Sequence, residues 1–108
     1  MKPVAFLGDS LSTLKGFPGS ARRRAGYQID RIQRGFDPDD WKPMPAIGPG
    51  AREIRVRDGT GAFRVFYVAV RAEAVYVLHC FRKKSQRTSQ PDLELGAQRY
   101  KELMRGRK

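Results

Sequence analysis

Residues 53–84, EIRVRDGTGAFRVFYVAVRAEAVYVLHCFRKK, decide the fold of this chain. Their alternation of apolar and polar residues predicts three consecutive antiparallel strands, at residues 53–57, 62–70 and 75–81. Residues 58–61 (DGTG) have the composition of a hairpin turn, and residues 71–74 are expected to form the next turn. In the first strand, Ile54 and Val56 face the core while Arg55 and Arg57 share the other face. A sheet that carries cations in place of apolar side chains is expected to bind a ligand there.

The residues before this sheet predict a strand over residues 2–7, a short helix over residues 10–14 and a longer helix from Ser20. Apolar residues in the longer helix recur at spacings of four, four, three and four, which places them on one face: Ala21, Ala25, Ile29, Ile32 and Phe36. Five arginines lie largely off that face: Arg22, Arg23, Arg24, Arg31 and Arg34. Such a cluster is either a solvated surface or part of a surface that follows phosphates, and the sequence leaves both interpretations open.

Residues 36–50 contain four of the seven prolines, and we expect an irregular connection there. Met44 and Ile47 are candidates to pin it to the core. Trp41, the single tryptophan of the chain, either caps the core or stacks on a base or a partner.

The last helix is expected to begin near Ser89, because Pro91 and Asp92 suit the first turn of a helix. Its apolar stripe packs on the sheet and consists of Leu93, Ala97, Tyr100 and Met104. Gly96 is expected to be a weak point in this helix.

Composition and charge narrow the class of partner. A chain of 108 residues suits one domain over residues 1–108, and 22 basic against 11 acidic residues leave a formal charge of +11. This charge favours a polyanionic partner: nucleic acid first, an acidic protein second and an anionic membrane third. The single cysteine, Cys80, excludes a disulfide framework and suggests no metal cluster. The apolar run at residues 4–7 is too short for a signal peptide or a membrane span, so we expect a soluble, cytoplasmic protein.

Seven short motifs, taken in order, identify a family resemblance. They are GDS near the start, FP before a basic helix, DWKPM, EIRVR, GAFRVFYVA, VYVLHCFRKKSQ and a closing RYKEL. Their order and spacing resemble the phage-derived toxin group within the HigB and RelE-like superfamily of toxin–antitoxin systems, from about Phe6 to Leu103. The resemblance implies an α+β fold, with an N-terminal strand and two helices packed on an antiparallel sheet of about four strands, and a C-terminal helix. It also implies cleavage of messenger RNA on the ribosome without a metal or cofactor, and a helix-turn-helix, HigA-like antitoxin as partner.

The resemblance also suggests which residues bind and cleave RNA. RelE-like nucleases carry a basic pair on one strand and an arginine in the next, which match Arg55, Arg57 and Arg64. A further cation after the last strand matches Lys83 or Lys84. The pair is lysine in RelE but arginine here, which keeps phosphate binding but argues against a general base, because arginine stays protonated.

Metal-independent cleavage uses the neighbouring 2′-hydroxyl as nucleophile, and we assign Arg64 to stabilising the added charge on phosphorus. His79, the only histidine, is a candidate for proton transfer, although a lone histidine in a strand is often a satisfied core residue. Lys83 or Lys84 with a lowered pKa is the alternative. Phe81 either stacks on a base or packs in the core, and Arg82 and Arg87 are expected to bind RNA.

Two other functions remain open at this point. The ParE branch of the same fold poisons DNA gyrase by binding alone, and a small basic module can bind RNA or DNA without catalysis. The expected convergence of Arg55, Arg57, Arg64, His79 and Lys83 on one surface favours the nuclease, because a binding protein does not need it.

Overall fold

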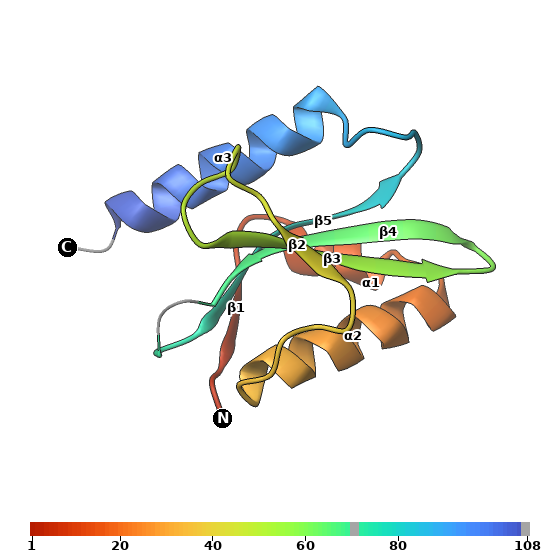
Figure 1. The fold of residues 1–108 in the computed structure, drawn as a ribbon, viewed down its shortest axis with the longest axis horizontal. Helices are drawn as coiled ribbons and strands as arrows, with labels where there is room; N and C mark the ends of the chain where they lie inside the picture. Colours follow the sequence, from red (N-terminus) through yellow and green to blue (C-terminus); the bar gives the residue numbers. More distant parts are fainter. Residues whose placement is uncertain (70–71, 107–108) are drawn as a thin grey trace.

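A mixed five-stranded sheet forms the middle layer of the computed structural model, which describes residues 1–69 and 72–106 (Figure 1). Its strands are β1 (Val4–Phe6), β2 (Trp41–Pro43), β3 (Ala51–Asp58), β4 (Gly61–Val68) and β5 (Val75–Lys83). Their order across the sheet is β1-β5-β4-β3-β2. Strands β3 to β5 are antiparallel, as predicted. Strand β2, which the sequence did not predict, also pairs antiparallel with β3, while β1 joins the sheet parallel to β5.

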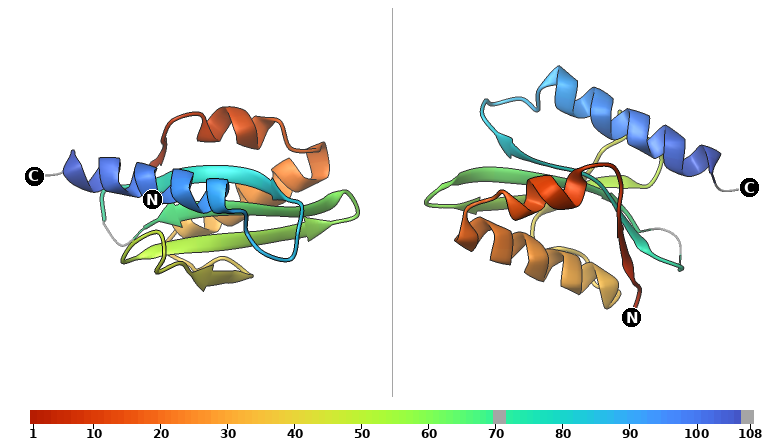
Figure 2. Two further views of the ribbon diagram at one scale, coloured as in Figure 1. Left: turned by 90° about the horizontal axis from the view of Figure 1, so that it is seen from above. Right: turned by 180° about the vertical axis from the view of Figure 1, so that it is seen from behind.

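Helices cover both faces of the sheet (Figures 1 and 2). The helices α1 (Ser10–Lys15) and α2 (Gly19–Gln33) lie on one side, and α3 (Gln90–Arg105) crosses the other. The predicted α+β architecture is therefore confirmed, and it is consistent with a RelE-like fold. None of the helices in the described part of the chain is long and apolar enough to cross a membrane.

The first core lies between α2 and the sheet. Ile54 and Val56 of β3 are buried in it, as their alternation predicted, and the α2 residues Ala21, Ala25, Ile29 and Ile32 are buried against them. Phe36 does not continue that apolar stripe, because the helix ends at Gln33 and Phe36 is 59% exposed. Gly35 has a φ of +93°, a conformation that glycine adopts readily and that turns the chain away from the helix axis.

The β3–β4 hairpin follows its predicted turn. Asp58 pairs with Gly61 at the end of the ladder, and the backbone N–H of Thr60 donates to the Asp58 carboxylate. The predicted second strand ended at Val70 and the next turn began at Arg71, and both residues lie outside those that the structure describes.

The proline-rich connection is less irregular than expected, because it contains β2. Trp41 pairs with Ile54 of β3, and its half-buried ring lies 4.0 Å from the guanidinium carbon of Arg52. Met44 and Ile47 are buried, which confirms that they pin this segment. A three-residue edge strand between prolines has too little alternation to be recognised from sequence.

The second core lies between α3 and the sheet, where Phe66, Leu78 and Phe81 are buried. Ser89 caps α3 by accepting a hydrogen bond from the Asp92 N–H, so the predicted start is confirmed. The expectation that Gly96 weakens the helix misses its role in packing. A Cβ at Gly96 would lie 2.8 Å from the Phe66 ring, so the absence of a side chain lets α3 approach the sheet.

Candidate functional site

Four cations of the sheet lie on its α3-side face, at the hairpin end: Arg55, Arg57, Arg64 and Lys83. Strand register places Arg55 opposite Arg64, and it places Ala62 between Arg57 and Lys83. The β3–β4 hairpin extends past the N-terminal end of α3 (Figure 1). Because α3 does not reach this end of the face, Arg57 stays exposed and Lys83 half-buried.

Arg64 is the most deeply placed of these cations, with only 4% of its surface exposed. Its Nε lies 3.6 Å from Oε1 of Glu53, and one terminal nitrogen donates to the Phe63 carbonyl at 3.0 Å. Burial lowers the pKa of the Arg64 guanidinium, while the Glu53 carboxylate opposes that shift. Arg64 therefore has the charge partner that its place in an apolar strand requires.

Glu53 is a site residue that the sequence interpretation missed. It is 1% exposed, lies 3.5 Å from Nε of Arg55 and accepts a hydrogen bond from Thr88 Oγ1 at 3.4 Å. Alternation along β3 contained the signal, because Glu53 shares a face with Arg55 and Arg57. One buried carboxylate thus holds the two arginines that the sequence assigned to phosphate binding and to the transition state.

A hollow of about 420 Å³ opens beside Arg64, and we call it the sheet-face hollow. Arg57, Arg64, Lys83 and Lys84 line it. The pKa of Lys83 is lowered, first by partial burial and then by the nearby Arg64 cation. The lining of this hollow therefore offers four cations to an anion.

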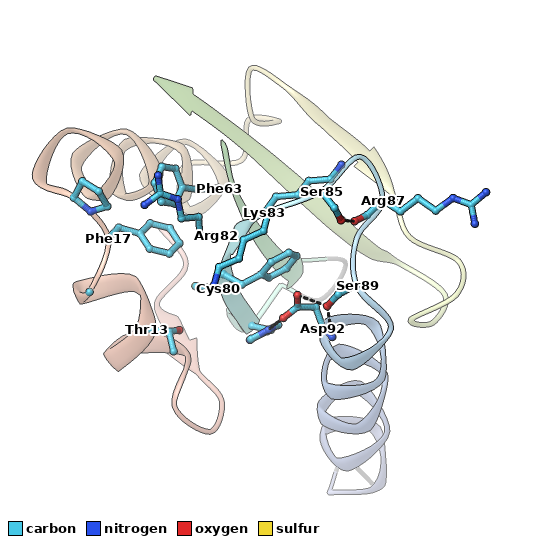
Figure 3. Close-up of a pocket in the computed structure, with 15 residues that line it drawn as sticks. Thr13, Phe17, Phe63, Cys80, Arg82, Lys83, Ser85, Arg87, Ser89 and Asp92 are labelled. Carbon is cyan, nitrogen blue, oxygen red and sulfur yellow. Dashed lines mark hydrogen bonds and ion pairs between the residues drawn. The ribbon is translucent and has the colours of Figure 1, made fainter. Parts of the chain in front are cut away.

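A second hollow, of about 620 Å³, lies along the edge of β5, and we call it the β5-edge hollow. Figure 3 shows it between Thr13 and Phe17 on one side and Ser89 and Asp92 on the other, with Lys83 between them. Lys83 and Lys84 line both hollows, so the two adjoin each other. The Cys80 thiol is buried in its wall, and burial raises its pKa to about 12, which makes it a poor nucleophile.

His79 also lines the β5-edge hollow, with Nε2 2.7 Å from Oδ1 of Asp92. Its ring stacks on that of Phe81, with 4.9 Å between the ring centroids, and Nδ1 is buried without a hydrogen-bond partner among the described residues. The sequence interpretation placed Asp92 in the first turn of α3 for its effect on the helix dipole. Only packing of α3 on the sheet brings it to His79.

The remaining predicted RNA-binding residues differ in their placement. Phe81 is 8% exposed and packed between His79 and Phe66, so the core interpretation is correct and base stacking is not supported. Arg82 lies over the Phe63 ring at 5.4 Å and donates to the Thr60 carbonyl. Arg87 lines the β5-edge hollow and points out of it (Figure 3).

The structure therefore places most predicted site residues in the linings of two adjoining hollows. Arg55 lies apart from both, in a further hollow between α2 and β3. Among residues 1–69 and 72–106, no three His, Cys, Asp or Glu side chains gather where they could hold a metal ion.

A comparison with family models identifies the chain. The model described as "Phage derived protein Gp49-like (DUF891)" matches residues 12–101. The chain belongs to this Gp49-like family. This is a RelE/HigB-like toxin family, so membership implies a RelE-like toxin and an antitoxin partner. No curated protein matched the Gp49-like chain.

Proposed function

We propose that this Gp49-like toxin is a metal-independent endoribonuclease that cleaves messenger RNA on the ribosome. In this proposal residues 1–108 form one toxin domain that acts in the cytoplasm and is neutralised by a HigA-like helix-turn-helix antitoxin. One observation carries the proposal: Lys83 lines the sheet-face hollow together with Arg64, and it lines the β5-edge hollow together with His79. Lys83 therefore has the proposed phosphate clamp in one hollow and a second group that can transfer a proton in the adjoining one.

Arg64 is the proposed clamp for the scissile phosphate. A planar guanidinium donates two hydrogen bonds to phosphate oxygens, and its strength grows where water is excluded. The ion pair with Glu53 limits how Arg64 can turn, which supports a preorganised role. Arg57 and Lys84, which line the same hollow, would hold the adjoining phosphates.

His79 is the proposed general base. Because the Asp92 carboxylate can only accept, Nε2 of a neutral His79 carries the hydrogen and Nδ1 keeps a lone pair. Nδ1 is buried in the free protein, so the proposed step requires the residues packed over it to move when RNA binds. Nδ1 then takes the proton of the 2′-hydroxyl, and the 2′-oxygen bonds to phosphorus. The bond from phosphorus to the 5′-oxygen breaks, which leaves a 2′,3′-cyclic phosphate on one product.

Lys83 is the proposed general acid that protonates the departing 5′-oxygen. Its lowered pKa supports this role, because an ammonium group with a lower pKa gives up its proton more easily. Lys83 and Arg64 lie on the same face of neighbouring strands, two residues out of register, which suits groups that act on one phosphate.

Primer extension on total messenger RNA after a short pulse of expression tests the proposal. Wild-type toxin is expected to produce new 5′ ends within translated frames. His79→Gln and Lys83→Met should each reduce cleavage roughly 10²- to 10⁴-fold, while the exposed control Lys101→Met should cleave like wild type. Purified products should carry a 5′-hydroxyl and a 2′,3′-cyclic phosphate.

A different result would direct attention to the other branch of the fold. Growth arrest with unchanged RNA ends, together with inhibited supercoiling by purified DNA gyrase, would contradict the nuclease. Cleavage that His79→Gln leaves intact would keep the nuclease but remove this histidine from proton transfer.

A further inference from the structure

The hollow between α2 and the edge of β3 has no role in the proposed cleavage. Its volume is about 530 Å³, and we call it the α2 hollow. Arg23, Arg24 and Tyr27 line it from α2, and Arg55 and Arg57 line it from β3. Strand β2 pairs with residues 52–54 of β3, and the Arg55 N–H donates to the Asp40 carbonyl, so the edge of β3 is uncovered only beyond Arg55.

Arg57 connects the α2 hollow to the proposed catalytic site. It lines both the α2 hollow and the sheet-face hollow, just as Lys83 and Lys84 line both the sheet-face and the β5-edge hollows. The three hollows thus form one series across the hairpin end of the sheet, from α2 to α3. Strands β3 and β5 are about 10 Å apart in this direction, so the series is longer than a single phosphate needs.

The α2 hollow carries more positive charge than its acidic residues balance. Four arginines line it, against two aspartates, Asp39 and Asp40. Asp39 is already engaged, because it lies 3.6 Å from Nε of Arg31 and accepts a hydrogen bond from Gln28. In the described part of the chain, neither Arg23 nor Arg57 forms an ion pair.

Tyr27 adds an exposed aromatic ring to these cations. It is 56% exposed, whereas most aromatic residues of this protein are buried or half-buried. Tyr27 lies four residues after Arg23 and three after Arg24, so all three share one face of α2. Cations that follow a phosphate backbone beside a ring that can stack on a base are the usual elements of a single-strand binding groove.

We propose that the α2 hollow binds nucleotides of the RNA substrate that lie outside the scissile step. This proposal rests on the nuclease function above. Arg23, Arg24 and Arg57 bind successive phosphates, and Tyr27 stacks on a base between them. The RNA strand then runs from α2 over the hairpin end of the sheet to Arg64 and Lys83.

Binding of two 2′-O-methyl RNAs, a dodecamer and a trinucleotide, tests the proposal, because neither can be cleaved. Arg23→Ala/Arg24→Ala should weaken dodecamer binding about tenfold or more and leave trinucleotide binding unchanged. The slope of log affinity against log salt should fall by about 1.4, at roughly 0.7 for each lost phosphate contact. The matched control is Arg34→Ala/Lys101→Ala, which removes two exposed cations that line none of the three hollows and should match wild type.

Tyr27 supplies a second test that leaves the charge unchanged. Tyr27→Ala should weaken binding of the dodecamer severalfold. Tyr27→Phe should bind it like wild type, because a phenyl ring still stacks. Circular dichroism should show the same fold in both variants, since the side chain is exposed.

The outcomes separate this groove from the catalytic proposal. Equal losses of dodecamer binding in the Arg23→Ala/Arg24→Ala variant and the control would overturn the proposed role of the α2 hollow. The nuclease proposal would stand, because wild type would still cleave RNA. A wild-type protein that neither binds nor cleaves RNA would overturn both proposals. If Arg23→Ala/Arg24→Ala lost binding to an aspartate-rich dodecapeptide but kept RNA binding, the RNA assignment would be overturned. The α2 hollow would then bind an acidic protein segment.

Discussion

The two faces of the sheet are built from the same strands, yet they differ in what covers them. On the α2 side, Ile54, Val56 and Val65 form a continuous apolar layer beneath α1 and α2. On the α3 side, the apolar layer stops at Phe81, and Arg64 and Lys83 continue the face toward the hairpin. One face stabilises the fold along most of its length, while the other divides its length between a core and a cationic site.

This comparison predicts that the α2-side face is the more sensitive to loss of volume. Ile54 is fully buried there, and Ile54→Ala is expected to lower the free energy of unfolding by about 2–5 kcal/mol, through lost transfer free energy and a residual cavity. Urea denaturation measures the change. A loss of unfolding free energy below about 1 kcal/mol would show that α2 and the sheet do not form a tightly packed core around Ile54.

On the α3-side face, the same comparison predicts a loss of activity with little loss of structure. Arg64→Lys keeps the charge beside Glu53 but removes the planar pair of donors, so cleavage should fall roughly 10²-fold. RNA cleavage by purified protein measures the effect, and the exposed control Arg34→Lys should be neutral. Unchanged cleavage would assign Arg64 to structure alone.

Two helical glycines sharpen the contrast between α2 and α3. A Cβ at Gly96 would lie 2.8 Å from Phe66, whereas one at Gly26 meets nothing within 4 Å. Gly96→Ala should therefore destabilise by about 1–2 kcal/mol through overpacking, and Gly26→Ala should stabilise by about 0.5–1 kcal/mol through helix propensity. Thermal unfolding of both variants checks the opposite signs, and equal signs would contradict close packing at Gly96.

The smallest expected effect concerns acid stability at the start of α2. Hydrogen bonds from Ser20 and then Thr60 lower the pKa of Asp58 from 3.8 to about 2. Because the folded pKa is the lower one, the ionised carboxylate stabilises the protein above about pH 4, and this contribution disappears as the pH falls toward 2. The stability difference between wild type and Asp58→Asn should shrink over that range, and a difference independent of pH would contradict the assignment.

The sequence alone was sufficient for much of the fold. Strict alternation in β3 assigned Ile54 and Val56 to the core and Arg55 and Arg57 to the opposite face, because side-chain direction in a strand has a period of two. The spacing of Ala21, Ala25 and Ile29 likewise identified the buried face of α2. These are local properties of the backbone, and neighbouring residues are enough to read them. The short strand β2 escaped recognition because it is too brief to show a period.

Only the tertiary structure decided how the candidate site is assembled. The contact between His79 and Asp92 joins β5 to α3, and that between Glu53 and Thr88 joins β3 to the segment before α3. Arg57 connects two hollows only because β3 pairs with β4 in this register. Such contacts depend on register and on the position at which α3 crosses the sheet. Alternation reveals which face a residue occupies, but packing at Gly96 determines how much of that face α3 covers.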